Sequence, residues 1–139
     1  MFKVRTLTVR GLSWEDARRK CLNYGGDLVS VANKSEMDFI YSKSSQHTNE
    51  KYWIGLNDRQ NESLFVWSDG TPYNRSVYSN WYPNEPNDRA GEDCVELYGR
   101  KWNDNSCKKE FSYICERPKG LLFFKISSGI GNLVSLLNV

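Results

Sequence analysis

Oxygen-bearing side chains gather between positions 85 and 104 of this chain. The stretch contains six carboxylates and two amides around Cys94, with no serine or histidine among them. Oxygen donors at this density suit a cation that takes about six to eight oxygen ligands in irregular geometry, which is calcium rather than zinc. The same residue types also form ordinary solvated turns. Composition alone leaves both interpretations open, and the order of the motifs described below favours calcium.

The chain has few of the side chains on which enzymes commonly depend. His47 is its single histidine, and most zinc sites and nucleophile–base pairs need an imidazole. Paired carboxylates such as Glu85 and Glu92 would suit a hydrolase, but acid catalysis needs one carboxyl protonated, whereas metal ligation keeps both ionised. The sequence therefore predicts a binding protein and not an enzyme.

Charge and cysteine content narrow the class further. The net charge is +2 from 19 basic and 17 acidic residues, and no run of Lys and Arg interleaves with aromatics, so nucleic acid is not an expected partner. The four cysteines contain no Cys-x-x-Cys pair, which favours structural disulfides with three alternative pairings. Disulfides persist in oxidising compartments, so we expect a secreted protein or a cell-surface ectodomain. Acceptor sequons at Asn33, Asn61 and Asn74 agree with a glycoprotein.

Two amphipathic helices are expected in the amino-terminal half, where they would form part of the scaffold. The first follows Ser13 as N-cap, stops at Gly25-Gly26 and places four residues near one face: Trp14, Ala17, Cys21 and Leu22. The second opens at residues 35–38, fades near Gln46 and buries Met37, Ile40 and Tyr41.

Strand patterns lie on both sides of a long polar loop. Strands are expected at residues 2–9, 27–32, 52–56, 94–97, 101–103 and 111–116. Residues 57–93 are mostly polar apart from a short apolar stretch at 64–67. Loops of this length in a compact domain are uncommon and usually functional. The sequence thus predicts an α+β domain in which two helices and small antiparallel sheets carry a long binding loop.

The carboxyl-terminal residues 119–139 have a different character. They form an apolar tail, for which a helix is one interpretation. A membrane-spanning helix needs about 20 predominantly apolar residues, and Lys125 with several serines, glycines and asparagines interrupts this one. We therefore do not expect the domain itself to associate with a membrane. A segment that packs on the domain or on a partner and a disordered end are the alternatives.

Four motifs occur in one order along the chain: Trp53-Ile54-Gly55-Leu56, Glu85-Pro86-Asn87, Gly91-Glu92-Asp93-Cys94 and Trp102-Asn103-Asp104. Together they resemble the C-type lectin domain, from near Lys3 to Pro118. The resemblance implies that residues 1–118 form a carbohydrate-recognition domain of C-type lectin-like fold, with disulfides Cys21–Cys115 and Cys94–Cys107. Members of the family usually carry a further strand before position 2, so a domain clipped at its amino terminus is expected.

The resemblance also implies the binding residues. The main calcium site would consist of Glu85, Asn87, Glu92, Asn103 and Asp104. The same five residues would hydrogen-bond the sugar, and a cis bond before Pro86 would point Glu85 and Asn87 the same way. Some family members hold an auxiliary calcium, here at Asp58, Glu62, Asp88 and Asp93. Asp58 and Glu62 could equally be solvated, and a glycan on Asn61 would crowd them. Tyr82 is a further candidate sugar contact.

In this family the order Glu-Pro-Asn, rather than Gln-Pro-Asp, is associated with mannose, N-acetylglucosamine and fucose over galactose. The implied function is calcium-dependent binding of such glycans for recognition or adhesion. Affinity for one sugar would be weak, so clustering of several domains in an oligomer would supply avidity. The alternative is a lectin-like domain that binds a protein partner independently of sugar, because function lies in the site and not in the fold.

Overall fold

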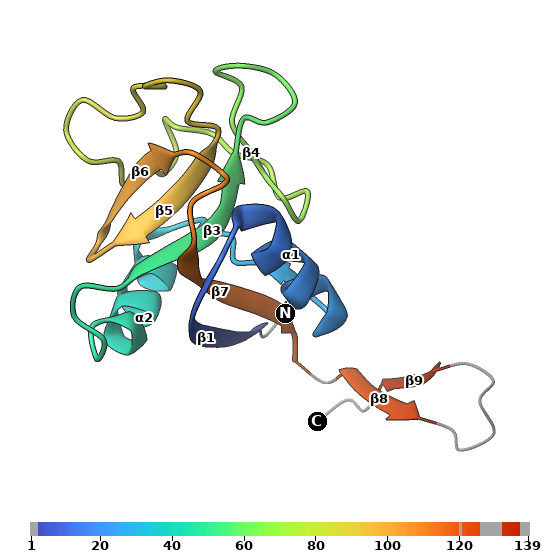
Figure 1. Ribbon diagram of the computed structural model, residues 1–139. Helices are drawn as coiled ribbons and strands as arrows, with labels where there is room; N and C mark the ends of the chain where they lie inside the picture. The colour runs from blue at the N-terminus through green and yellow to red at the C-terminus, as the bar shows by residue number, and fades with distance from the viewer. Residues whose placement is uncertain (1–2, 120, 126–131, 137–139) are drawn as a thin grey trace.

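The first and last strands of the main body lie side by side. The computed structural model describes residues 3–119, 121–125 and 132–136. β1 (Lys3–Leu12) pairs antiparallel with β7 (Phe111–Pro118), from Lys3 opposite Pro118 to Leu12 opposite Phe111. This pairing closes the scaffold at its base, on the side away from the long loops (Figure 1).

The main sheet has the strand order β1-β7-β3-β5-β6, with β2 added to β7 and β4 added to β3. The remaining strands are β2 (Asp27–Leu28), β3 (Lys51–Asn57), β4 (Val66–Trp67), β5 (Cys94–Tyr98) and β6 (Lys101–Asn105). Among the described strands, every pairing is antiparallel except that of β3 with β7, which is parallel. The α+β prediction is confirmed, but the sheet is mixed, because the long connection from β3 to β7 allows a parallel contact.

Two helices pack against this sheet, as expected. α1 (Trp14–Asn23) is capped by Ser13, whose Oγ accepts a hydrogen bond from the Asp16 N–H at 3.2 Å. α2 (Lys34–Ser44) is capped by Asn33, whose Oδ1 accepts from the Glu36 N–H at 2.9 Å. The second helix therefore begins slightly before the expected residues 35–38, because an asparagine side chain satisfies its free N–H groups.

The buried helix faces differ from the expected ones at two positions. α1 buries Trp14, Ala17 and Cys21, whereas Leu22 is 51% exposed. α2 buries Met37, Ile40 and Ser44, and Tyr41 is only half-buried. In both helices the contact stripe is narrower than the apolar pattern, because each helix covers only part of the sheet.

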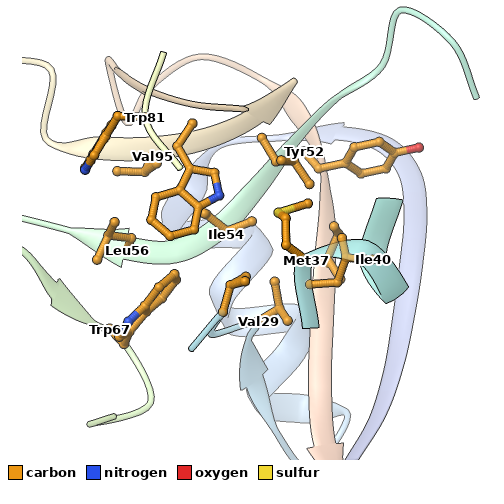
Figure 2. Close-up of a cluster of buried hydrophobic side chains, with 13 residues drawn as sticks. Val29, Met37, Ile40, Tyr52, Ile54, Leu56, Trp67, Trp81 and Val95 are labelled. Atoms are coloured by element: carbon orange, nitrogen blue, oxygen red, sulfur yellow. The ribbon is translucent and has the colours of Figure 1, made fainter. Parts of the chain in front are cut away.

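The core lies between the sheet, α2 and the base of the long loops. Figure 2 shows Val29, Met37 and Ile40 facing Ile54 and Leu56 of β3, with Trp67 and Trp81 closing the side nearest the loops. A second cluster surrounds Trp14, Trp53 and both disulfides. The two indole N–H groups are satisfied there: Trp14 Nε1 donates to the Ile54 carbonyl and Trp53 Nε1 to the Leu12 carbonyl, each at 2.9 Å. These contacts hold the scaffold on which the loops sit.

Two disulfides tie the loops and helix to the sheet. Cys21–Cys115 joins α1 to β7, and Cys94–Cys107 joins the start of β5 to the turn after β6. They are the pairs that the resemblance implies. Gly55 of β3 also allows Ser68 to approach the strand closely, since a Cβ at position 55 would lie 2.7 Å from Ser68 Oγ.

Two expected elements differ from the structure. Of residues 27–32 only Asp27–Leu28 form a strand, although Val29 still exchanges backbone hydrogen bonds with Ile114 and Gly55. The interpretation of the tail as a helix is wrong: β8 (Leu121–Lys125) and β9 (Asn132–Leu136) pair as an antiparallel hairpin beside the main body (Figure 1). Residues 120, 126–131 and 137–139 of the tail lie outside the described residues. No helix in the described part of the chain is long and apolar enough to cross a membrane.

Candidate functional site

The long loop meets the β5–β6 hairpin at Asp104, a fully buried residue of β6. Its carboxylate accepts the Asn87 N–H at 3.1 Å on both oxygens and the Asp88 N–H at 2.7 Å. The Cys94–Cys107 disulfide lies at the neighbouring end of the same hairpin. Asp104 therefore anchors the Glu-Pro-Asn segment to the sheet.

Glu85 and Asn87 lie together in this segment. The Glu85–Pro86 peptide bond is cis, and Asn87 Nδ2 donates to Glu85 Oε1 at 2.8 Å. Asn87 Oδ1 in turn accepts from the Arg89 N–H at 3.0 Å. The structure thus brings together three of the predicted ligands, Glu85, Asn87 and Asp104.

Glu92 belongs to the same electrostatic cluster. Burial and the nearby carboxylate of Asp104 raise the pKa of Glu92, while the Arg89 N–H and Lys109 act in the opposite direction. Burial, a hydrogen bond with Asp104 and the charges of Asp104 and Glu92 raise the pKa of Glu85 to about 7. These carboxylates therefore repel one another in the folded chain.

Asn103 is oriented differently from the other predicted ligands. It precedes Asp104 in β6, and neighbouring strand residues point to opposite faces. Its Nδ2 donates to Glu96 Oε1 at 3.0 Å. No hydrogen bond joins the Asn103 side chain to Glu85, Asn87 or Glu92 among the described residues. The structure therefore brings Asn103 next to the cluster only through the backbone of Asp104.

The predicted auxiliary residues form a second acidic group. Carboxylate oxygens of Asp58, Glu62 and Asp93 lie within 4.8 Å of one another. Asp58 is 3% exposed and its N–H donates to the Asp93 carbonyl at 3.1 Å. Burial, together with Glu62 and Asp93, raises the pKa of Asp58 to about 6, although the Ser63 N–H acts against this shift. Three of the four predicted auxiliary residues therefore lie within reach of one ion.

Asp88, the fourth auxiliary residue, links the two acidic groups. It lines a cavity of about 260 Å³ with Asp58, Glu62 and Asp104. Its Oδ1 also accepts the Glu92 N–H at 3.1 Å. Asp88 thus contributes to the loop geometry as well as to the cavity wall.

The donor set fits calcium better than a transition metal. All the clustered donors are oxygens, and carboxylate and amide oxygens are ligands that calcium accepts in irregular arrangements. Glu85 Oε2 and Asp58 Oδ1 are buried and have no hydrogen-bond partner among the described residues. Buried polar atoms are normally satisfied, so a cation near these oxygens would complete both.

The aromatic residues around Tyr82 differ in their burial. Trp81 and Trp102 are buried in the core, with ring centroids 5.9 Å apart. Tyr82 is half-buried, and its hydroxyl donates to the Tyr98 carbonyl at 2.9 Å. The Tyr82 hydroxyl is therefore already engaged at the end of β5.

Two residues near the site were not predicted. Arg75 Nη2 donates to the Glu85 carbonyl at 3.2 Å and lines the cavity with Asp88. Glu96 holds the Asn103 amide. Nothing local in the sequence points to Arg75, but an expected β5–β6 hairpin with its register would have placed Glu96 opposite Asn103.

Comparison with known proteins adds the family context. Residues 10–117 match a family model described as "Lectin C-type domain". C-type mannose receptor 2 of Mus musculus is 38% identical over 109 residues, which cover 76% of this chain and 7% of that protein. The low affinity immunoglobulin epsilon Fc receptor of Mus musculus is 44% identical over 108 residues, covering 75% of this chain and 30% of the receptor. The chain thus spans less than a third of the length of these curated relatives.

Solved structures of differently named proteins show the same fold. The carbohydrate-recognition domain of cow CD23, crystallised in the presence of a GlcNAc2Man3 oligosaccharide, has a TM-score of 0.74 and 37% identity, covering 84% of this chain and 88% of that chain. Herring type II antifreeze protein has a TM-score of 0.76 and 28% identity, covering 85% of this chain and 94% of that chain. The fold alone therefore does not determine the ligand, which depends on the residues of the site.

Proposed function

Because the chain belongs to the C-type lectin domain family, we propose that it is a calcium-dependent lectin domain for glycans with mannose-type terminal sugars. The proposed ligands of the main calcium, which also contact the sugar, are Glu85, Asn87, Glu92, Asn103 and Asp104. Domains of this family are non-enzymatic carbohydrate-binding proteins that typically bind calcium. The prediction that the chain is not an enzyme is therefore confirmed by its family.

The observation that carries the proposal is a cluster of carboxylates without a cation of its own. Among the described residues, no ion pair within 4.0 Å involves Glu85, Glu92 or Asp104, nor any of the auxiliary acids: Asp58, Glu62, Asp88 and Asp93. The charges of Arg89 and Lys109 act on Glu92 only from beyond this distance, and the Arg89 N–H hydrogen-bonds to it. Clustered carboxylates that repel one another favour binding of a cation from solution, and of these acids only Glu62 and Asp88 are exposed.

The same side chains can recognise a sugar. A carboxylate such as that of Glu85 accepts from a sugar hydroxyl, and an amide such as that of Asn87 donates to the hydroxyl oxygen. When bound, calcium supplies positive charge and coordination positions for two neighbouring hydroxyls. A pair of hydroxyls at the right spacing thus satisfies acceptors and donors of the protein at once.

The proposed sugar class depends on the order of side chains around Pro86. Glutamate at 85 and asparagine at 87 are associated in this family with mannose, N-acetylglucosamine and fucose. The cow CD23 domain with its mannose-containing oligosaccharide supports this choice. A shallow polar site of this kind buries little apolar area, so several clustered domains would be needed for avidity.

The remaining assignments follow from the same proposal. Residues 1–118 would be the lectin domain and residues 119–139 a separate tail. The two disulfides support an extracellular location. Asp58, Glu62, Asp88 and Asp93 would bind an auxiliary calcium, for which calorimetry should give two calcium ions per chain. One ion per chain in the sugar-competent state would remove the auxiliary site.

A glycan array with the full chain, run in calcium and again in chelator, tests the function. We expect retention of mannose-terminated glycans in calcium, competition by free mannose and loss of binding in chelator. The variant E85Q/N87D keeps the oxygen donors but reverses the order of charge and amide, and it should move the preference toward galactose. E116Q alters a distant buried carboxylate and should leave the profile unchanged.

The outcomes separate the proposal from its rivals. A wild-type array dominated by terminal galactose would contradict the sugar class. Retention of glycans in chelator would contradict the calcium mechanism. The alternative is a lectin-like domain that binds protein. Saturable binding of a protein partner, unchanged by chelator and by free mannose, would favour it.

A further inference from the structure

Glu96 is a buried carboxylate of β5 that lies beside the proposed site but belongs to neither acidic group. It is 1% exposed and lies directly opposite Asn103 in the β5–β6 register. Its Oε1 lies 3.0 Å from Lys51 Nζ of β3. Glu96 therefore has its own cation and is not available as a calcium ligand in the way that Glu85 is.

Two asparagine amides converge on the same oxygen. Glu96 Oε1 accepts from Asn103 Nδ2 at 3.0 Å and from Asn105 Nδ2 at 3.4 Å. An ionised carboxylate only accepts hydrogen bonds. The Asn103 amide must therefore turn its nitrogen toward Glu96 and its Oδ1 away from it.

This orientation matters because the two ends of an amide are chemically opposite. A cation binds the oxygen of Asn103 and is repelled by its NH₂ group. The second N–H of the same nitrogen stays available to a sugar oxygen while the first is held by Glu96. One buried carboxylate can thus fix both functions of Asn103.

The partner of Glu96 is itself held in place. Lys51 Nζ lies 5.3 Å from the Phe111 ring centroid and 5.7 Å from that of Tyr98. The negative faces of the two rings attract the ammonium group and hold it there. The chain of contacts runs from Lys51 through Glu96 to Asn103. Asp104 orients the Glu-Pro-Asn loop, and nothing else in the described residues holds the Asn103 amide.

We propose that Glu96 is a positioning residue of the lectin site, which selects the amide orientation of Asn103 in which Oδ1 can ligate calcium. This inference rests on the proposed function, since it concerns a ligand of the proposed calcium. Groups that orient metal ligands typically change metal affinity by about 10- to 100-fold when they are removed. The effect should appear in calcium affinity and not merely in folding.

Calcium titration by calorimetry, with the full chain and well below its melting temperature, tests the proposal. E96L removes the acceptor, and we expect its calcium dissociation constant to rise roughly tenfold. E96Q can offer either an acceptor or a donor to Asn103, so its effect should be smaller. E116Q is the matched control, because Glu116 is also buried and ion-paired but lies away from the site. It should leave calcium affinity unchanged.

A double-variant cycle separates positioning from a structural role. The carboxylate in N103D presents an oxygen whichever way it turns, so it needs no selection. We therefore expect E96L to weaken calcium binding in the wild-type background and not to weaken it in the N103D background, where it also removes the repulsion between two neighbouring carboxylates. If Glu96 had only a structural role, E96L would weaken calcium binding equally in both backgrounds.

Each result decides between the two proposals. If the wild-type chain binds calcium and E96L changes nothing, or weakens binding equally in both backgrounds, the positioning role is wrong and the lectin proposal stands. If the wild-type chain binds no calcium, the proposed function fails first. Should E96L not fold, the same cycle with E96Q gives the same distinction on a smaller scale.

Discussion

Two groups of carboxylates in this chain have opposite surroundings. In the scaffold, Lys51 Nζ lies 3.0 Å from Glu96, and Lys3 Nζ lies 3.2 Å from Glu116. At the loop site, no such ion pair within 4.0 Å involves Glu85 or Glu92 in the described part of the chain. The scaffold carboxylates are neutralised by the protein, and those of the loop site are not.

The neighbours of each group show what this difference means. Burial raises the pKa of Glu116, but Ser30 and Lys3 act against the shift. Burial also raises the pKa of Glu85, and here Asp104 and Glu92 add to the shift and bring it to about 7. In the first arrangement the protein itself supplies the positive charge, although Glu116 Oε2 accepts no hydrogen bond from the described residues. The second favours a cation from solution, and its stability should depend on that cation.

Substitution of Asp104 should have the largest effect on the loop site. D104N removes a charge and weakens the acceptor of the Asn87 and Asp88 N–H groups. We expect calcium affinity to fall by about 3 kcal/mol, roughly 100-fold, with loss of glycan binding. Calorimetry and glycan binding measure this. Unchanged binding in D104N would remove Asp104 from the site.

Substitution of Arg5 should affect the scaffold group instead. Arg5 is 10% exposed at its side chain and its Nε lies 3.4 Å from Glu116 Oε2. R5M should lower the free energy of unfolding by about 2 kcal/mol. The loss is smaller than the roughly 3–5 kcal/mol expected when a buried carboxylate loses its only counter-charge, because Lys3 still pairs with Glu116. Urea unfolding should give the same loss with and without calcium. If the stability lost in R5M depended on calcium, the scaffold carboxylates would not be independent of the loop site.

The pH dependence of stability should reverse with calcium. Without the ion, the folded chain holds Glu85 and Asp58 with pKa values of about 7 and about 6, above their ordinary values of 4.5 and 3.8. The folded chain then retains protons that the unfolded chain releases. The free energy of unfolding should therefore be highest below about pH 4 for these groups and fall as the pH rises toward 7.

Saturating calcium should give the opposite slope over the same range, because only ionised carboxylates ligate the ion. Melting temperatures recorded from pH 4.5 to pH 7.5, in chelator and in calcium, compare the two slopes directly. D104N should flatten the difference between them, since Asp104 contributes to the shifts of both Glu85 and Glu92. Parallel slopes in the two conditions would contradict the account of the loop site.

The smallest expected effect is at Asp58. In the wild-type chain the Ser63 N–H donates to Asp58 Oδ2 at 2.9 Å. D58N keeps an oxygen acceptor for this N–H but removes the charge that faces Glu62 and Asp93. In chelator the free energy of unfolding should rise by about 1 kcal/mol. In calcium the variant should lose the auxiliary ion and keep the main one. A destabilised variant in chelator would show that Asp58 does not experience net repulsion.

Much of the fold could be predicted because the relevant signals are local. Ser13 caps α1 as expected, and Trp53 and Trp102 are in the core. The motif around Pro86 also placed Glu85 and Asn87 together, since residues two apart in a turn remain neighbours. The complete ligand set stays a prediction, because it concerns a state with calcium.

The rest depends on contacts between distant segments. The parallel pairing of Tyr52 with Ser112 joins strands some 60 residues apart, and no local pattern encodes it. Leu22 fits the helical stripe but is exposed because the sheet does not extend beneath it. Glu96 lies in an expected strand, but its role was not predicted, because it depends on the β5–β6 register that places it opposite Asn103. The tail has apolar residues that fit a helix or a strand, and it forms β8 and β9.

The central claim is that a cation from solution completes the carboxylate cluster at Glu85 and thereby creates the sugar site. Titration of a mannoside into the full chain by calorimetry, first in chelator and then in saturating calcium, tests this most directly. We expect no heat of binding in chelator and a weak saturable isotherm in calcium. Equal mannoside binding in both conditions would contradict the account.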